Sequence, residues 1–249
     1  MEQKDFKIEI ATTDFNTTKN AVEGGADRIE LCAALTEGGI TPSYGTIKNC
    51  REVFTVQLFP IIRPRSGDFL YNEEEFNIMK ADVRLCKELD CDGIVIGLLT
   101  KKGDIDLERT QILIDMAYPM EITFHRAFDR CRDPFQALDQ LINIGCQRIL
   151  TSGQASTAPL GIDMIAKLVK AADERIIIMP GSGVRIESVR ELAERTGATE
   201  FHSSLRSKKK SKMDFIHPAF AESEESYSNA YIDPDDVKAM RKALLKKAD

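Results

Sequence analysis

Residue types that transfer protons or bind anions follow several short apolar runs of this chain. His125, Arg126 and Asp129 follow the run EITF, and Arg63 follows the run QLFPII. Three further runs lead into the short polar turns Ser152-Gly153, Gly181-Ser182-Gly183 and Ser203-Ser204. Histidine exchanges protons near neutral pH, arginine binds carboxylates and phosphates, and glycine-rich turns expose backbone N–H groups to anions. Brought together, these groups would bind and transform a small anionic molecule.

The apolar runs recur at the spacing of strand–helix repeats, and these repeats must position the polar residues. We predict eight strands at about residues 7–11, 28–32, 55–62, 93–98, 122–125, 148–151, 176–179 and 200–202. Helix starts between them are indicated by Asn72 before three glutamates and by Asp133 before Pro134. In a closed parallel barrel the carboxyl ends of all strands meet at one end, where such folds build their sites. One shared pocket is therefore expected there.

The length of 249 residues is typical of one β/α barrel, and no shift in composition marks a second domain. We predict a single (β/α)8 barrel over residues 1–249, with a last helix at about 235–247. The segment 36–49 contains Pro42 and several glycines, so we expect a shortened or missing helix after the second strand. An open dinucleotide-binding sheet is not favoured, because no G-x-G-x-x-G follows the first strand.

Alternation along the strands sorts side chains between the barrel lumen and its outer layer. The inward set includes Glu9, Glu30, Glu200, His125 and His202. Buried carboxylates need partners, and Arg63 and Arg126 are the nearest candidates by chain position. Two interpretations stay open, a buried ionic network that only fills the lumen and a functional site.

The candidate roles follow from side-chain chemistry. For general acid and base catalysis the candidates are Glu30, His125 and His202. For anion binding the candidates are Arg63, Arg126, Asp129, Ser152, Gly153, Gly181, Ser182, Gly183, Ser203 and Ser204. For a soft metal such as copper(I) the candidates are Cys32, at the end of the second strand, and Cys50, provided that the following loop folds back.

Composition narrows the partners. The formal net charge of -6 argues against a nucleic acid, and no apolar stretch reaches the roughly 20 residues of a membrane span. The first residues lack the apolar region of a signal peptide, so we expect a cytoplasmic protein. The six cysteines lack C-x-x-C spacing and are expected as free thiols. A homodimer or higher homo-oligomer is compatible with the sequence.

Several sequence blocks resemble the CutC copper-homeostasis family. The blocks are GGADRIELC, EGGITPS, IIRPRSGDFLY, TFHRAFD, RILTSG, PGSGV and TEFHSS, in the order of that family. The resemblance implies a β/α barrel in the cytosol that binds and handles copper. It further implies a site at Glu30, Cys32, Arg63, His125, Arg126, Asp129, Ser152 and His202. This chain departs from the family at Ala11, where many members carry a cysteine beside the one on the second strand.

Two functions of different classes follow. The first is copper handling, in which Cys32 and a second thiol or histidine bind Cu(I). The second is an enzyme that acts on a phosphate- or carboxylate-bearing small molecule, with His125 or His202 as acid or base and Arg63 and Arg126 as clamps. The residues alone favour the second function, because a metal carrier does not need a barrel mouth lined by arginines and Ser/Gly turns.

Overall fold

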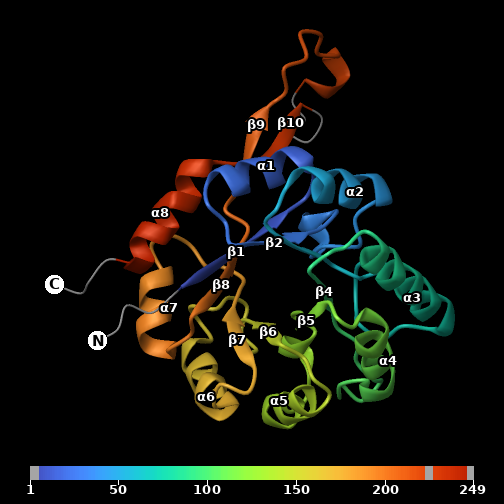
Figure 1. Ribbon diagram of the computed structural model, residues 1–249. Helices are drawn as coiled ribbons and strands as arrows, with labels where there is room; N and C mark the ends of the chain where they lie inside the picture. Colours follow the sequence, from blue (N-terminus) through green and yellow to red (C-terminus); the bar gives the residue numbers. More distant parts are fainter. Residues whose placement is uncertain (1–5, 222–226, 246–249) are drawn as a thin grey trace.

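The computed structural model describes residues 6–221 and 227–245, in which eight short parallel strands form a barrel inside a ring of helices (Figure 1). The strands are β1 (Lys7–Thr12), β2 (Arg28–Leu31), β3 (Gln57–Pro60), β4 (Gly93–Ile96), β5 (Glu121–Phe124), β6 (Arg148–Thr151), β7 (Ile177–Pro180) and β8 (Glu200–Ser203). The helices are α1 (Phe15–Glu23), α2 (Tyr44–Val53), α3 (Glu73–Glu88), α4 (Leu107–Ala117), α5 (Pro134–Asn143), α6 (Ile162–Ala172), α7 (Val189–Thr196) and α8 (Pro234–Leu245). The predicted barrel is confirmed.

Two four-stranded parallel sheets, ordered β3-β2-β1-β8 and β4-β5-β6-β7, make up the wall. They meet at β3 and β4, where Ile61 and Val95 form a parallel bridge and the Ile62 N–H donates to the Val95 carbonyl at 2.8 Å. On the other side β7 lies beside β8. Neighbouring strands are thus consecutive around the ring, and their carboxyl ends share one rim.

The helix starts agree with the capping signals. Asn72 caps α3 in a reciprocal capping box with Glu75, and the Asp133 carboxylate accepts from the first turn of α5.

The expectation of a shortened or missing helix after the second strand is wrong. Helix α2 has 10 residues, as α5 does, because Ser43 caps it directly after Pro42 and it continues through Gly45 to Val53. The short 3-10 turn Leu35–Glu37 precedes Gly38 and Gly39, which lie between the turn and the helix.

Strand alternation places side chains as expected. Ile8, Ile29, Phe124 and Phe201 belong to a large apolar cluster between strands and helices. A separate small cluster of Cys32, Phe59, Ile61 and Val95 lies within the barrel. The barrel therefore has an apolar outer layer and a lumen with room for charged side chains.

A two-stranded antiparallel hairpin follows the barrel and stands out beside α1 (Figure 1). Its strands are β9 (Arg206–Lys210) and β10 (Ser228–Ile232). Lys208, Lys209 and Lys210 lie on β9 and are exposed. Helix α8 then packs beside α1 and α7, while residues 246 and 247 of the expected last helix lie outside the described part. Within residues 6–221 and 227–245, no helix has the length and apolar character needed to cross a bilayer.

Candidate functional site

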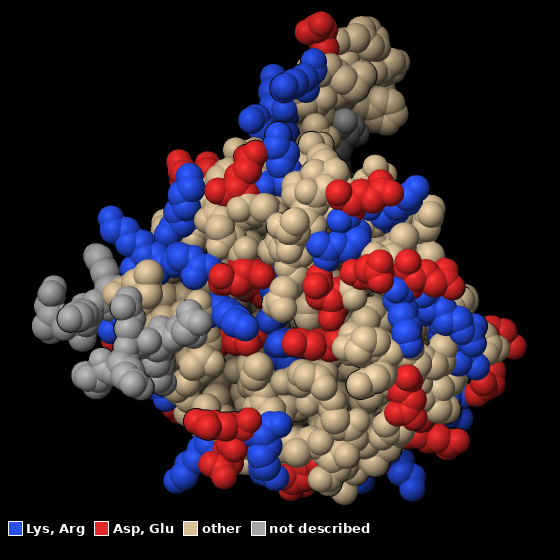
Figure 2. All heavy atoms as spheres, in the orientation of Figure 1, with Lys and Arg blue, Asp and Glu red and all other residues tan. Residues whose placement is uncertain are grey.

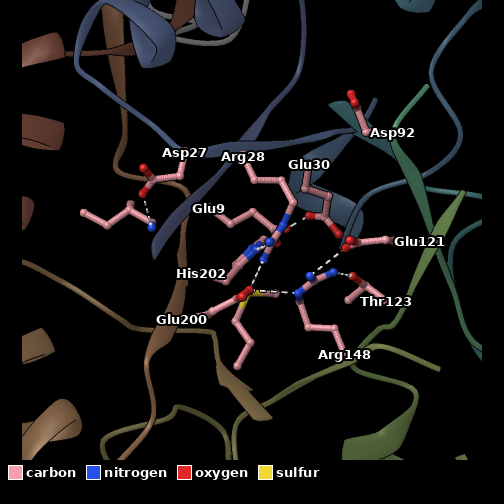
Figure 3. A network of polar contacts seen from close by, with 12 residues as sticks. Glu9, Asp27, Arg28, Glu30, Asp92, Glu121, Thr123, Arg148, Glu200 and His202 are labelled. Carbon is pink, nitrogen blue, oxygen red and sulfur yellow. Dashed lines mark hydrogen bonds and ion pairs between the residues drawn. The ribbon is translucent and has the colours of Figure 1, made fainter. Parts of the chain in front are cut away.

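The lumen contains a buried network of ion pairs, here called the lumen network, formed by Glu9, Arg28, Arg148 and Glu200 with Glu121 at its edge (Figure 3). Arg28 binds Glu9 through Nε and Glu200 through Nη2, the latter at 2.6 Å. Arg148 donates to Glu200 from Nε and to Glu121 from Nη2, each at 2.8 Å. Both guanidinium groups lie over the Phe59 ring, 5.2 and 5.5 Å from its centroid. Each arginine therefore binds two carboxylates.

Electrostatics keeps this network charged despite its burial. Burial alone would raise the pKa of Glu9, but the Arg28 charge and the His202 hydrogen bond outweigh it and lower that pKa to about 2. Burial opposes the charge on Arg28, yet Glu9 and Glu200 raise its pKa. The partners expected from chain position, Arg63 and Arg126, do not bind these carboxylates. That expectation is wrong because Arg28 and Arg148 point into the lumen at the level of the glutamates.

His202 connects the lumen network to the rim. Its Nδ1 lies 2.7 Å from Oε1 of Glu9, and its Nε2 lies 3.7 Å from Oε2 of Glu30. Burial would lower the pKa of His202, but Glu30 and Glu9 together raise it. Burial raises the pKa of Glu30, and the neighbouring Glu9 adds to that effect. Glu30 and His202 are thus an acid and a base whose pKa values are both raised, held side by side.

A cavity of about 840 Å³, the mouth cavity, opens at the carboxyl ends of the strands. Its lining includes Glu30, Arg63, His125, Arg126 and His202. The convergence expected from strand parity is therefore confirmed. The chemical roles of these five residues remain predictions.

His125 occupies the mouth cavity as a neutral imidazole. Burial and then the Arg63 charge lower its pKa to about 3. Its Nδ1 accepts the Ala127 N–H at 3.1 Å, so the proton is on Nε2, and that atom is buried without a partner among the described residues. The His125 ring can occupy this place only because residue 97 is a glycine, since a Cβ on residue 97 would lie 2.3 Å from the ring. His125 therefore offers a hydrogen-bond donor to a ligand rather than a base.

Arg63 is held by backbone carbonyls and by no carboxylate among the described residues. It donates to the carbonyls of Glu37, Gly39 and Gly67 at 2.7–3.1 Å, and its guanidinium lies 5.0 Å from the Phe69 ring centroid. Its Nε is buried and lacks a partner in the described part of the chain. The side chain is thus fixed in place while its positive charge stays uncompensated.

The predicted anion cradle is only partly formed. Asp129 binds Arg126 at 2.8 Å and accepts from the Ser152 N–H and hydroxyl. This leaves Ser152, and with it Gly153, closed off from the mouth cavity, because Asp129 already occupies the donors. Gly181 is also outside the lining, since its N–H donates to Thr151 and its Cα packs on Leu150 and His202.

The other turn residues do line the mouth cavity. These are Ser182, Gly183, Ser203 and Ser204. Ser182 has a positive φ of 74°, an uncommon conformation for a residue with a side chain. Its hydroxyl donates to the Ser156 carbonyl, and the Ser203 hydroxyl donates to that of Val184. Turns after β7 and β8, rather than after β6, are thus available to a ligand.

The two cysteine candidates lie apart. Cys32 is in the lumen cluster, where its thiol donates to Glu30 at 3.4 Å. Cys50 is on α2 in the outer core, and its thiol donates to Thr18 on α1. The idea that Cys50 joins Cys32 is therefore not supported by their positions. Burial and the Glu30 charge raise the pKa of Cys32, and the described residues contain no group of three or more His, Cys, Asp or Glu side chains suited to a metal.

Several lining or network residues escaped the sequence analysis. They are Arg28, Arg148, Arg130, Arg185 and Arg206. The alternation along the strand that places Glu30 in the lumen also places Arg28 there, two positions earlier on the same strand. The inward position of Arg28 was therefore predictable from the sequence. Arg130, Arg185 and Arg206 lie in loops or on the hairpin, where strand parity gives no information.

Comparison with known proteins identifies the family. The CutC family model matches residues 6–207. The chain belongs to the CutC family. A CutC family protein of Parabacteroides distasonis is 54% identical over 84% of this chain and 86% of its own length. The human copper homeostasis protein cutC homolog is 44% identical over 87% of this chain and 79% of its own.

Solved structures agree. A putative copper homeostasis protein CutC from Streptococcus agalactiae superposes with a TM-score of 0.77 and 33% identity, covering 80% of this chain and 98% of that one. A phosphoribosylanthranilate isomerase from Thermotoga maritima has a TM-score of 0.58 at 10% identity, with 96% of this chain and 98% of that chain covered. That second likeness shows the barrel fold alone.

Proposed function

We propose that this CutC family member binds a small phosphate- or carboxylate-bearing molecule in the mouth cavity and transfers protons on it. The observation that carries the proposal is the number of arginines there that form no ion pair, in a lining that also includes the carboxylates of Glu30, Glu37, Asp68 and Asp129. Arg63, Arg130, Arg185 and Arg206 line the cavity, and none forms an ion pair with a carboxylate among the described residues. Arginines ordinarily find acidic neighbours in a chain with 40 Asp and Glu residues. Four that do not are suited to bind an anion.

The donors beside these arginines have a defined geometry. The unpartnered Nε2–H of His125 and Nε–H of Arg63 belong to side chains that both contact Phe69, whose ring centroid is 4.9 Å from that of His125 and 5.0 Å from the Arg63 guanidinium. A buried donor without an acceptor costs free energy, on the order of 1–3 kcal/mol, unless a ligand oxygen satisfies it. A carbonyl or carboxylate oxygen of a ligand would satisfy such a donor.

Proton transfer is assigned to Glu30, with His202 as its relay. Glu30 lines the cavity, and burial raises its pKa, which favours a carboxyl group that can both donate and accept a proton. His202 lies 3.7 Å behind it and is anchored by Glu9. The neutral His125 would polarise the ligand oxygen while Glu30 exchanges a proton with the ligand. Because Glu9 is deeply buried, its contact with His202 keeps the His202 ring in a fixed position relative to Glu30.

Cu(I) handling is the second candidate, and it is favoured by the similarity to the human copper homeostasis protein cutC homolog. The residues present fit copper(I) poorly. Cys32 is a single thiol, its raised pKa keeps it protonated, and Ala11 offers no second sulfur at the neighbouring strand end. We expect weak Cu(I) binding in competition with a chelator. Tight one-to-one binding that is lost in Cys32→Ser and kept in Cys50→Ser would favour copper over the anion.

A cytosolic location is part of the proposal. All six cysteines are free and buried, which is typical of a protein in a reducing compartment. Since each thiol is covered, the fold does not depend on disulfides. Secretion into an oxidising compartment is therefore not favoured.

A thermal-shift titration with phosphate, sulfate and sugar phosphates tests the proposal. At a hundred times the dissociation constant a ligand adds about 2.7 kcal/mol of stability, which raises Tm by roughly 5–10 °C for a chain of this size. Arg130→Gln combined with Arg185→Gln should abolish the shift. Arg132→Gln is the matched control, because Arg132 is exposed but paired with Asp104 at 2.7 Å outside the cavity. The absence of any shift with all these anions would overturn the proposal.

A further inference from the structure

The side chains around the mouth cavity can move protons, but they offer few nucleophiles. Among the described residues that line it there is no lysine and no cysteine. No lining serine bonds to a histidine within the described chain, and the hydroxyls of Ser182 and Ser203 donate to backbone carbonyls. A lysine Schiff base, a thiolate or an activated serine is therefore not offered to a ligand there. The carboxylates and imidazoles of the lining are suited to proton transfer.

Glu30 lines the cavity and keeps one carboxylate oxygen free. Its Oε2 accepts the Cys32 thiol at 3.4 Å and lies 3.7 Å from Nε2 of His202, which is drawn beside it in Figure 3. Its Oε1 forms no hydrogen bond with any residue in the described part of the chain. Burial raises the pKa of Glu30, which makes it a stronger base than a carboxylate in water. Oε1 is thus available to remove a weakly acidic proton from a ligand.

The imidazole donor comes from the other side of the barrel ring. Glu30 on β2 and His202 on β8 flank β1, whereas His125 follows β5. The ring runs β1-β2-β3-β4-β5 in one direction and β1-β8-β7-β6-β5 in the other, so β5 is opposite β1. The buried Nε2–H of His125 has no acceptor among the described residues. A ligand between these walls would meet a carboxylate base on one side and an uncharged donor on the other.

Cations and exposed N–H groups suited to a phosphate lie after β7 and β8. Gly183 and Ser204 line the cavity there together with Arg185 and Arg206. Barrel enzymes frequently hold a phosphate in the loops after these two strands. Arg206 begins β9, and the basic side chains of that strand form the blue edge of the projecting hairpin in Figure 2. This positive charge would attract an anion toward the same side of the cavity.

Building on the proposed function, we propose that the ligand is a phosphorylated carbonyl compound and that Glu30 and His125 enolise it. Glu30 takes a proton from the carbon next to the carbonyl group. The C–H electron pair forms the C=C double bond, and the carbonyl π electrons move onto the oxygen, to which Nε2–H of His125 donates. The proton then returns from Glu30 to that carbon, so the step needs no oxidant, reductant or leaving group. A carboxylate base with a neutral imidazole donor is an arrangement suited to this chemistry.

Deuterium exchange on the full chain tests the inference. The protein is incubated in D₂O with dihydroxyacetone phosphate or with fructose 6-phosphate, and proton NMR follows the signal of the hydrogens on the carbon next to the carbonyl. Wild type should exchange these hydrogens. Glu30→Gln, which keeps the shape of the side chain, should slow the exchange by about a hundredfold to ten-thousandfold. Glu52→Gln makes the same change on the exposed side of α2 and should exchange like wild type.

Two further variants separate chemistry from folding. His125→Asn keeps an oxygen that can accept the Ala127 N–H but removes Nε2–H, so exchange should fall by about a hundredfold to a thousandfold. Glu30→Asp keeps the charge but withdraws it by one methylene group, and it should also slow the exchange. In each variant the melting temperature should still rise with the same two sugar phosphates. That shift shows that the variant is folded and that it still binds the ligand.

The outcomes distinguish this inference from the ligand binding on which it rests. A rise in melting temperature without proton exchange would overturn the inference alone and leave anion binding in place. The absence of both the rise and the exchange would overturn both. Equal exchange rates in wild type and Glu30→Gln would also overturn the inference, because a host isomerase carried through purification would act equally in both preparations.

Discussion

The floor of the barrel lumen and its mouth both contain arginines, but in opposite electrostatic states. In the lumen network Arg28 and Arg148 each bind two carboxylates. At the mouth Arg63 binds only backbone carbonyls, and Arg185 has no carboxylate partner among the described residues. Paired buried charges fix a structure, whereas unpaired charges around a cavity are available to a ligand. The contrast separates arginines that stabilise the barrel from arginines that are available to bind a ligand.

The largest expected effect on the free energy of unfolding comes from a substitution in the lumen network. Arg28→Met should lower the free energy of unfolding by about 3–5 kcal/mol, because it removes the guanidinium between two buried carboxylates and leaves Glu9 with only His202 and Glu200 with only Arg148. Urea unfolding at pH 7 measures the loss. Arg132→Met, which removes an exposed ion pair with Asp104, should cost less than about 1 kcal/mol. A loss equally small for Arg28→Met would contradict the structural role of the lumen network.

The sequence predicts the barrel and the inward glutamates because alternation is a local property. The apolar partners of Glu9 and Glu30 pack outward, so the carboxylates can only point inward. Register across strands is not local, and pairing Arg28 with Glu200 needs the closure of β8 onto β1. The sequence therefore indicates that partners exist without saying which they are.

The mouth is harder to predict because loops form it. The motif F-H-R-A-F-D places His125 at the cavity, but its neutral state depends on the Ala127 N–H and on the space left by Gly97. Ser152 looks like an anion ligand in the sequence, yet Asp129 takes up its donors. Such competition between a ligand and a neighbouring side chain appears only in three dimensions.

A second test sharpens the comparison through pH. The pKa of His125 falls from 6.5 in the unfolded chain to about 3 in the folded one, chiefly through burial. Below pH 6.5 the unfolded state takes up a proton that the folded state refuses, so stability is lost as the pH falls toward 3. Between pH 6.5 and 4.5 this amounts to about 2 kcal/mol. His125→Gln should remove that loss, as urea unfolding at a series of pH values would show.

His202 should behave in the opposite sense. Its pKa is raised because Glu30 and Glu9 outweigh the burial that opposes the charge. The stabilisation that protonated His202 adds to the free energy of unfolding is fully present below pH 6.5. It is lost as the pH rises through the pKa of His202 in the folded state. His202→Gln should therefore flatten the alkaline side of the stability profile, and His125→Gln the acidic side. Profiles that change on the same side would contradict the assigned charge states.

The smallest expected change in stability tests the mouth itself. Arg185→Gln removes an exposed cation with no ion pair in the described chain, so the free energy of unfolding should change by less than about 0.5 kcal/mol. A slight gain is consistent with relief of repulsion among the mouth arginines, since sites built for ligands are often stabilised when they are neutralised. The same substitution should weaken binding of a sugar phosphate about tenfold, because each charge-assisted contact contributes roughly 1.5–3 kcal/mol. Isothermal titration calorimetry beside urea unfolding gives both quantities on one preparation. Loss of stability without loss of binding would place Arg185 with the floor arginines and remove the distinction on which the proposed ligand site depends.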